Sequence, residues 1–368
     1  MLAGNTVGVQ VPLSAPHTNT VCFLALTVLS VAYPLLPAGP DSAGGAEQIL
    51  ALLERGIIHA GHRSVVIAAR GSEVSGHLIP TSPSSGEITE AQRSSAQREH
   101  LECINTALLQ YRIDLIHFHG LDFNTYLPRH ALPKLATLHL PPAWYPPAIF
   151  DAPDLHLNCV SHTQATTTPG KAKLPVVPNG IDLQQYAPAA AATNRPVRND
   201  LLWIGRICPE KAVHIALELA HSLDLPAVVA GPVHPFHDHQ AYFSKRVQPL
   251  LDDRRRHVGP IGLKQKIKLL SEARCLLIPS VVAETSSLVA MEAIGSGTPV
   301  IAFRSGALPE VIDHGVTGFL VDSQDEMADA VRRSDDISPA TCRDVANQRF
   351  DAARMVNDYL RLYESLLA

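Results

Sequence analysis

Two carboxylates eight positions apart have a spacing that suits ligand binding. Glu284 begins the stretch Glu-Thr-Ser-Ser-Leu-Val-Ala-Met-Glu, and Glu292 ends it. Ser286 or Ser287 is a suitable N-cap, which makes Glu292 the only charge of an apolar predicted helix. Eight helical residues separate such groups by about 12 Å along the axis, wider than the roughly 5 to 9.5 Å of a glycosidase acid and base. The pair suits opposite ends of an extended ligand; the alternative is a solvated Glu292 and an ordinary loop at Glu284.

A second candidate segment carries two cations after a predicted strand. Arg206 follows the run Leu-Leu-Trp-Ile-Gly, and Pro209 suits the first turn of a helix that would include Lys211. Ligands of open α/β sheets bind at such strand ends. Cations in a first turn oppose the helix dipole, so they call for an anion or an acidic neighbour. The alternative is a surface pairing of Lys211 with Glu210 or Glu218.

Glycines follow the first predicted strand, at Gly44 and Gly45, just before a helix that starts near residue 46. They would let backbone N–H groups approach an anion at the positive helix end, although a plain turn reads the same way. Neither GxGxxG after the first strand nor GxxxxGK(S/T) occurs, which argues against dinucleotide dehydrogenases and P-loop ATPases.

Other polar clusters are weaker candidates. The segment 234–239 holds three histidines that could suggest zinc, but it lacks helical i, i+4 spacing, and no metal site is predicted. The basic run 254–256 is typical of a solvated turn, and Lys264, Lys266 and Lys268 of an exposed helix face.

The elements that would position these residues alternate between short apolar strands and helices, which is typical of parallel sheets. Strands are predicted at 26–32, 64–69, 114–118, 134–139 and 155–160, and again at 201–205, 227–230, 275–279, 299–303 and 318–321. A surface loop is predicted at 71–86, a helix at about 89–110 and an amphipathic helix at 346–368.

This order predicts an α/β chain of two Rossmann-like domains. The predicted divisions are an N-terminal extension at 1–20, a first domain at 21–185, a linker at 186–200 and a second domain at 201–345. The linker carries two prolines and no periodicity.

Composition limits the functional classes. Of 368 residues, 46% are hydrophobic and 18% charged, with a net charge of -5, so neither half favours nucleic acid. The apolar stretch 21–32 is too short to span a bilayer, and no Lys or Arg precedes Arg55. Six widely spaced cysteines indicate reduced core thiols, and a cytoplasmic location is expected.

Taken together, the motifs resemble those of retaining glycosyltransferases of family four, also described as glycosyl transferases group 1. The matching segments are Gly44–Glu47, His117–Gly120, Pro178–Asp182, Gly205–Arg206 with Glu210–Lys211, the Glu284 and Glu292 pair, and Gly315–Leu320. The resemblance implies the GT-B fold, with two domains facing across a cleft and a C-terminal helix crossing back.

The resemblance also implies roles. Arg206 and Lys211 would hold the donor diphosphate, the Gly44–Gly45 loop would face it from the other domain, and the helix start at Ser287 and Leu288 would cover it. Glu292 would bind the ribose, Glu284 the transferred sugar, and His119 would lie near the reacting centre. The family usually has Phe-Gly where this chain has Ser286 and Ser287, which leaves the donor sugar open.

The expected reaction transfers a sugar from a nucleoside diphosphate donor, a uridine one, to an unidentified hydroxyl acceptor with retention. No cofactor, divalent metal or covalent nucleophile is expected. Rival hypotheses are a sugar-nucleotide epimerase or phosphorylase of the same fold, and a non-catalytic sugar-nucleotide-binding subunit.

Overall fold

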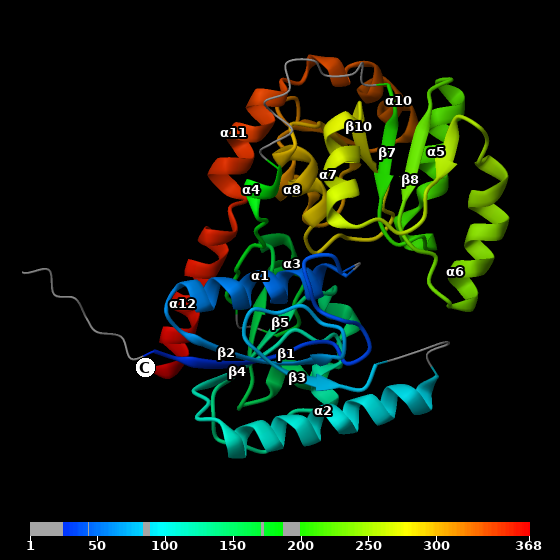
Figure 1. Ribbon diagram of the computed structural model, residues 1–368. Helices are drawn as coiled ribbons and strands as arrows, with labels where there is room; N and C mark the ends of the chain where they lie inside the picture. The colour runs from blue at the N-terminus through cyan, green and yellow to red at the C-terminus, as the bar shows by residue number, and fades with distance from the viewer. Residues whose placement is uncertain (1–24, 43, 84–88, 171–172, 187–198) are drawn as a thin grey trace, which may run out of the picture.

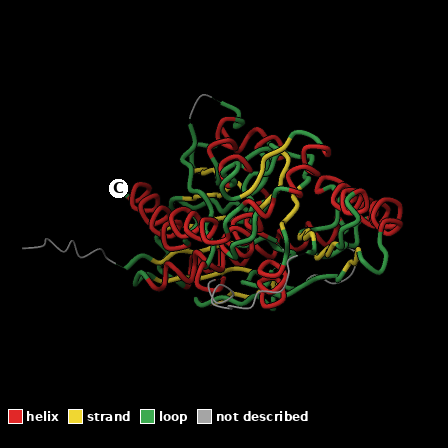
Figure 2. The backbone as a smooth tube through the Cα atoms, turned by 90° about the horizontal axis from the view of Figure 1, so that it is seen from above, coloured by secondary structure: helices red, strands yellow, loops and turns green. Residues whose placement is uncertain are grey.

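The computed structural model describes residues 25–42, 44–83, 89–170, 173–186 and 199–368. The predicted N-terminal extension and most of the predicted linker lie outside these residues. Two six-stranded parallel sheets form two domains, one above the other in Figure 1. Seen from above, in Figure 2, helices surround the strands.

The first sheet has the order β3-β2-β1-β4-β5-β6. Its strands are β1 Thr27–Val31, β2 Arg63–Ala69, β3 His77–Thr81, β4 Leu115–Phe118, β5 Lys134–Leu138 and β6 His156–Cys159. The helices of this domain are α1 Gly45–His59, α2 Glu90–Gln110 and α3 His162–Thr166. The predicted helix at 89–110 is confirmed, since Thr89 caps α2 through a hydrogen bond from the Gln92 N–H.

The second sheet has the order β9-β8-β7-β10-β11-β12. If its strands are counted from β7 as the first, this is the same order as in the first sheet. Its strands are β7 Leu201–Ile204, β8 Ala227–Ala230, β9 Arg255–His257, β10 Cys275–Ile278, β11 Val300–Phe303 and β12 Gly318–Val321. Its helices are α5 Val213–Ser222, α6 His237–Tyr242, α7 Leu263–Glu272, α8 Leu288–Gly295, α9 Leu308–Val311, α10 Gln324–Arg332 and α11 Pro339–Arg349. Both halves are doubly wound, as predicted.

Two predicted loops are strands. The surface loop predicted at 71–86 contains β3, whose Pro80 pairs in register with Ala68 at the sheet edge, where proline is tolerated. The basic run 254–256 overlaps β9 at the edge of the second sheet, and Arg255 is buried there. Ion pairs from Arg255 to Asp252 and Asp224 compensate the burial of its charge.

The chain crosses between the domains twice at one place. The short helix α4 Leu183–Tyr186 follows the first crossing, and the second lies between α11 and α12 Ala352–Leu367. Hydrogen bonds from Ile181 N to the Phe350 oxygen and from Ala352 N to the Ile181 oxygen join the two crossings. The helix predicted from residue 346 is therefore interrupted, because α11 ends at Arg349 and Asp351 caps α12.

The helix α12 packs on the N-terminal domain, as Figure 1 shows. Its Met355, Val356, Tyr359 and Tyr363 share a buried apolar cluster with α1 and β1. The C-terminal helix thus crosses back and ties the end of the chain to the first domain.

Candidate active site between the two domains

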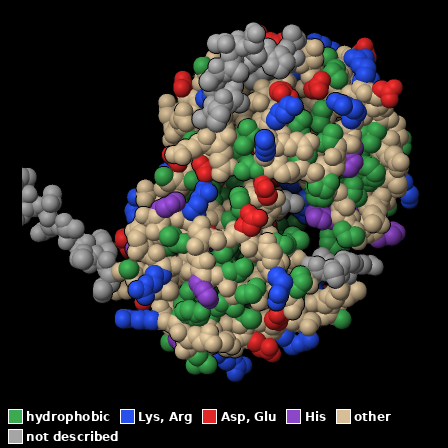
Figure 3. Space-filling view, viewed as in Figure 1, with side chains coloured by type: hydrophobic (Ala, Val, Ile, Leu, Met, Phe, Trp, Pro, Cys, Tyr) green, Lys and Arg blue, Asp and Glu red, His purple; other side chains and the backbone are tan. Residues whose placement is uncertain are grey.

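The site segments follow the strands at which each sheet reverses its order. In the first sheet these are β1, which leads to the Gly44–Gly45 loop, and β4, which leads to His119. In the second they are β7, which leads to Arg206, and β10, which leads to Glu284. Such reversal points are where open α/β sheets bind ligands. Figure 3 shows the molecule hollowed where the two domains meet, with acidic side chains beside the hollow.

Lys211 and Glu284 form an ion pair at this boundary. The Lys211 Nζ lies 2.6 Å from Oε1 and 2.8 Å from Oε2 of Glu284, and Ser280 donates a hydrogen bond to the same carboxylate at 2.5 Å. Lys211 sits in a short 3-10 turn, Pro209–Lys211, that precedes α5, rather than in the helix itself. The surface pairing of Lys211 with Glu210 or Glu218 is therefore wrong.

The backbone that carries Glu284 is held by Gly306. This glycine has φ +55°, and a Cβ there would lie 2.2 Å from the Glu284 carbonyl oxygen. The same carbonyl accepts a hydrogen bond from Ala307 N at 2.7 Å. The close approach requires glycine and fixes the loop from which Glu284 points at Lys211.

Arg206 takes part in none of the ion pairs among the described residues. Its charge acts on Glu47 of α1, across the domain boundary. Burial raises the pKa of Glu47, and the Glu47 backbone hydrogen bond and the Arg206 charge lower it in part. The structure thus leaves a guanidinium available to an anion next to the Gly44–Gly45 turn.

The starts of α1 and α8 meet across the boundary. A Cβ added to Gly45 would lie 3.4 Å from Leu288 Cδ1, so the two helix starts are in contact. Ser287 is the N-cap of α8, but its side chain makes no capping hydrogen bond. The N-cap of α1 is Gly44, which has no side chain that could cap the helix. The N–H groups of a first turn lack intrahelical partners, which makes the α8 start suitable for an anion. At α1 the Glu47 carboxylate lies beside Gly44 and accepts from its own backbone N–H, so an anion there would share the remaining N–H groups.

Glu292 lies inside the protein rather than on a solvated face. Its Oε1 accepts hydrogen bonds from Lys266 Nζ at 2.5 Å and from the Tyr186 hydroxyl at 2.9 Å. Burial, and then the adjacent Glu292 carboxylate, raise the pKa of Tyr186. The prediction that Lys264, Lys266 and Lys268 form one exposed face is wrong for Lys266, because α7 turns that residue toward α8.

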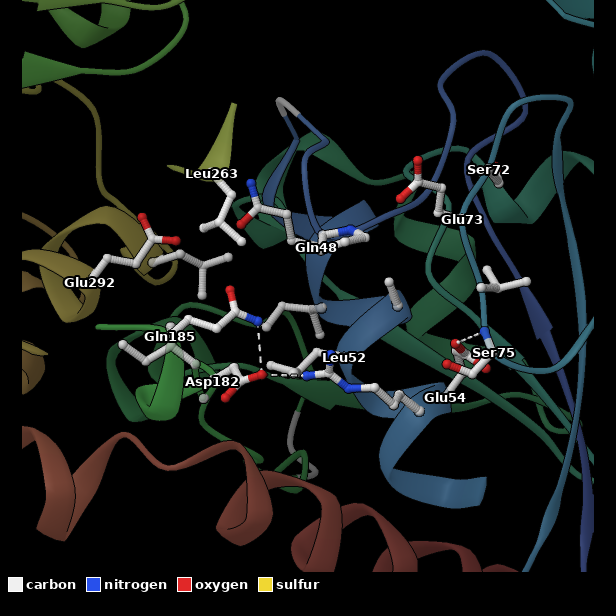
Figure 4. Close-up of a pocket in the computed structure, with 18 of the residues that line it drawn as sticks. Gln48, Leu52, Glu54, Ser72, Glu73, Ser75, Asp182, Gln185, Leu263 and Glu292 are labelled. Carbon is white, nitrogen blue, oxygen red and sulfur yellow. Dashed lines mark hydrogen bonds and ion pairs between the residues drawn. The ribbon is translucent and has the colours of Figure 1, made fainter. Parts of the chain in front are cut away.

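A cavity of about 460 Å³ adjoins Glu292 and is lined by both domains. Figure 4 shows Glu292 and Leu263 on one side, with Gln48 and Leu52 of α1 facing them. Further along, Asp182 binds Arg55 and Gln185, and its ion pair with Arg55 is 2.7 Å. Sequence reasoning missed Lys266, Tyr186 and the α1 face, since no local motif marks them.

His119 is buried at the end of β4. Its Nδ1 lies 3.3 Å from His139 Nε2, and its Nε2 has no hydrogen-bond partner among the described residues. Burial lowers the pKa of His119, as do the nearby His117 and His139. The His139 carbonyl accepts a hydrogen bond from Thr285 at 2.9 Å. His119 therefore reaches the Glu284 loop through His139 and shares no hydrogen bond with Arg206, Lys211 or Glu284 in the described structure.

The fold matches solved glycosyltransferases. Sucrose-phosphate synthase from Thermosynechococcus elongatus aligns with a TM-score of 0.75 at 20% identity, covering 93% of this chain and 99% of that one. A glycosyltransferase involved in avilamycin A biosynthesis aligns at 0.71 and 22%, covering 93% and 98%. An Anabaena protein in complex with UDP-glucose aligns at 0.72 and 17%, covering 92% and 100%. The two-domain architecture is that of the GT-B fold, as predicted.

Residues 198–334 match the family model described as glycosyl transferases group 1. Among curated relatives, a D-inositol 3-phosphate glycosyltransferase of Kribbella flavida is 34% identical over 44% of this chain and 42% of its own length. A glycogen synthase of Mycobacterium tuberculosis is 28% identical over 71% and 77%. The second domain of the chain therefore matches the glycosyl transferases of group 1.

Two further findings concern the extent of the match to these relatives and the helices of the chain. The chain spans about two fifths of the length of the inositol-phosphate relatives. In the described part of the chain, no helix combines the length and apolar character needed to cross a bilayer.

Proposed function

We propose that the protein transfers a sugar from a nucleoside diphosphate sugar, a uridine one, to a hydroxyl acceptor with retention at the anomeric carbon. The observation that carries the proposal is the arrangement along α8. Lys211 and Glu284 form a pair just before the helix, Ser287 and Leu288 begin it, and Glu292 faces the cavity from its second turn. An extended ligand with an anionic centre fits this arrangement.

The Glu284 carboxylate contacts the Lys211 ammonium with two oxygens, much as a phosphate would. Donor binding would exchange that partner: Lys211, with Arg206, would take the diphosphate, and Glu284 would be released toward the sugar hydroxyls. The first turns of α1, beside Gly44 and Gly45, and of α8 add N–H donors to the same anion. In this exchange the ion pair of Lys211 and Glu284 is a replaceable contact rather than a permanent structural one.

Glu292 would bind the ribose hydroxyls. Its carboxylate keeps acceptor capacity beyond the hydrogen bonds from Lys266 and Tyr186, because an ionised carboxylate offers about four lone-pair sites. The adjoining cavity, about 460 Å³, is within the range of small-molecule sites. A neighbour of the same fold was solved with UDP-glucose, which supports a uridine donor.

The chemistry would break the bond between the anomeric carbon and the diphosphate and form one to the acceptor oxygen on the same face. The acceptor proton goes to the departing diphosphate, so no covalent nucleophile is assigned. Arg206, Lys211 and the α8 start would stabilise the developing negative charge without a divalent metal. His119 would line the reacting centre through its orphan Nε2. Cys103, Cys159, Cys208 and Cys275 are free thiols, which supports a reducing, cytoplasmic compartment.

A ligand panel tests the proposal. The melting temperature is measured with nucleotide sugars and with free nucleotides, because a bound ligand adds RT ln(1 + [L]/Kd) to stability. One sugar-bearing donor should exceed its free nucleotide and should release nucleoside diphosphate slowly. Conversion of that donor to its epimer without acceptor would favour an epimerase, and binding without any turnover would favour a non-catalytic subunit.

A further inference from the structure

Three metal-ligating side chains meet beside the phosphate-binding loop. Cys208 and Glu210 belong to the turn after β7, and His239 to the first turn of α6, at the outer edge of the second domain in Figure 1. The thiol sulfur, a carboxylate oxygen and a ring nitrogen of these residues all lie within 4.8 Å of one another. This is the only such group of three found among the described residues.

The burial of these groups points to a missing ligand. His239 is 6% exposed, and its Nδ1 has no hydrogen-bond partner in the described structure. An imidazole nitrogen buried without a partner is costly. Cys208 is fully buried, and its thiol lies 3.4 Å from the Arg206 carbonyl oxygen and within hydrogen-bond reach of the Glu210 carboxylate. Glu210 is half-buried, which leaves an approach from solvent.

In the sequence, zinc is suggested only by the three histidines of 234–239, and no metal site is predicted. Of the three histidines in 234–239, only His239 joins the group. His237 is exposed, and the His234 ring centroid lies 6.2 Å from that of His239. The other two ligands come from a turn about thirty residues away, which no local spacing could reveal.

We propose that Cys208, Glu210 and His239 bind one Zn²⁺ ion. Sulfur, nitrogen and carboxylate oxygen are its usual ligands, and three protein ligands leave a fourth position for water. Bond lengths of about 2.0 to 2.3 Å place ligand atoms about 3.5 Å apart, so modest side-chain rotation closes the observed spacing. Binding releases the thiol proton to solvent, and thiolate plus carboxylate then balance the charge of the ion.

The ion would act as a structural clamp on the donor site. Two of its ligands lie between Arg206 and Lys211 in the chain, and the third lies on α6. Cross-linking the turn to α6 would fix the loop that presents both cations, without contact between the ion and the donor. The proposal does not depend on the transfer reaction, because metal binding is measured directly.

Cobalt titration of the full chain tests it. Co²⁺ bound to a thiolate in a four-coordinate site gives charge-transfer and intense ligand-field absorption, and Zn²⁺ should bleach both at one equivalent per chain. Cys208→Ser should abolish the charge-transfer band. Glu210→Gln should weaken Co²⁺ affinity at least tenfold, and it alters a half-exposed residue, so a folded variant is available. His237→Ala, on the same helix, should leave spectrum and affinity unchanged.

Three results would overturn the proposal: no thiolate band at saturating Co²⁺, a band that persists in Cys208→Ser, or affinity that depends on His237 rather than on Glu210. Circular dichroism of each variant verifies the fold. A chain that binds nucleotide sugar but gives no cobalt band would refute the metal site alone. A cobalt band without donor binding would refute only the proposed function.

Discussion

At the residue scale, three lysines on one helix show what separates a ligand-site residue from a solvated one. The alternation of Lys264, Lys266 and Lys268 carries no sign that one of them points inward. Their orientation is set by tertiary packing, because α7 lies against α8 and Glu292 supplies the partner for Lys266. The only related signal in the sequence is that Glu292 is the lone charge of an apolar helix. That signal pointed to a functional carboxylate, but it did not reveal that Lys266 is its partner.

Replacing Lys266 tests this placement. The Lys266 and Glu292 side chains are 11% and 5% exposed, and removing one member of a buried pair costs about 3 kcal/mol or more. Lys266→Met should therefore lower the free energy of unfolding by about that amount in urea titrations. Lys264→Met, on the exposed side of α7, should change it by less than about 0.5 kcal/mol. Equal effects of the two variants would place Lys266 on the surface.

The buried histidines His117, His119 and His139 should make the folding stability of the protein sensitive to acid. Burial lowers the pKa of each, to about 4 for His139. The unfolded chain, with pKa values near 6.5, binds more protons below that pH, so stability is present at neutral pH and falls as pH drops from about 6.5 toward 4.

One pKa unit corresponds to about 1.4 kcal/mol, so the loss between pH 7 and 4.5 should exceed about 2 kcal/mol. Urea titrations at several pH values measure it. His139→Gln should flatten the pH dependence, whereas replacing the exposed His156 should not. A stability that stays constant over this range would show that the cluster is not buried as described.

At the scale of elements, the C-terminal helix α12 belongs to the core of the first domain. Tyr363 donates or accepts a hydrogen bond with His117 Nδ1 at 2.7 Å, and Thr137 contacts His117 Nε2 at 2.8 Å. His117 in turn packs against His119 with ring centroids 4.0 Å apart. The end of the chain therefore supports the side chain proposed to line the reacting centre.

Tyr363→Phe measures that support. It leaves a buried imidazole nitrogen without a partner, which should cost about 1 to 3 kcal/mol of unfolding free energy. Tyr111→Phe removes a hydroxyl that bonds His77 at the surface and should cost much less. A Tyr363→Phe effect no larger than the control would mean that α12 packs loosely on the sheet.

The helices and interior strands were predictable because their apolar periodicity is local, and all ten predicted strands are present. The two missed strands are sheet edges. β3 contains Pro80, and β9 consists of Arg255, Arg256 and His257, so neither has an apolar run. An edge strand forms hydrogen bonds with one neighbouring strand only, and whether such a segment becomes a strand depends on the sheet that it joins. The Arg206–Lys211 segment and the carboxylate pair could be found from sequence spacing, whereas Lys266 and Tyr186, the partners of Glu292, come from distant elements.

At the scale of the whole molecule, side chains of three described residues, Asp41, Thr285 and Glu310, form hydrogen bonds between the domains. Asp41 accepts a hydrogen bond from Leu263 N at 2.9 Å, Thr285 donates to the His139 carbonyl, and Glu310 accepts from His162 N and Thr163 N at 2.9 and 2.5 Å. The domains also share the paired crossings near Ile181 and Asp351. This arrangement is a closed cleft with a narrow hinge.

Donor binding should favour the closed arrangement, because the diphosphate would be held by loops from both domains. X-ray scattering should show a smaller radius of gyration in saturating UDP than without it. Glu310→Ala removes the bridge to α3 and should enlarge the difference by opening the free protein. An identical radius with and without nucleotide, in both proteins, would contradict hinge closure.

We propose that the two carboxylates bind different parts of the donor, and calorimetry of Glu284→Gln and Glu292→Gln with UDP and with the full donor tests this most directly. Glu292→Gln should weaken UDP and donor alike, by about 1.5 to 3 kcal/mol for a charge-assisted hydrogen bond. Glu284→Gln should leave UDP affinity at least as high as in the unmodified protein, since Lys211 loses a competing carboxylate, while slowing transfer. Equal losses of UDP affinity in the two variants, or no change in either, would contradict a donor spanning α8.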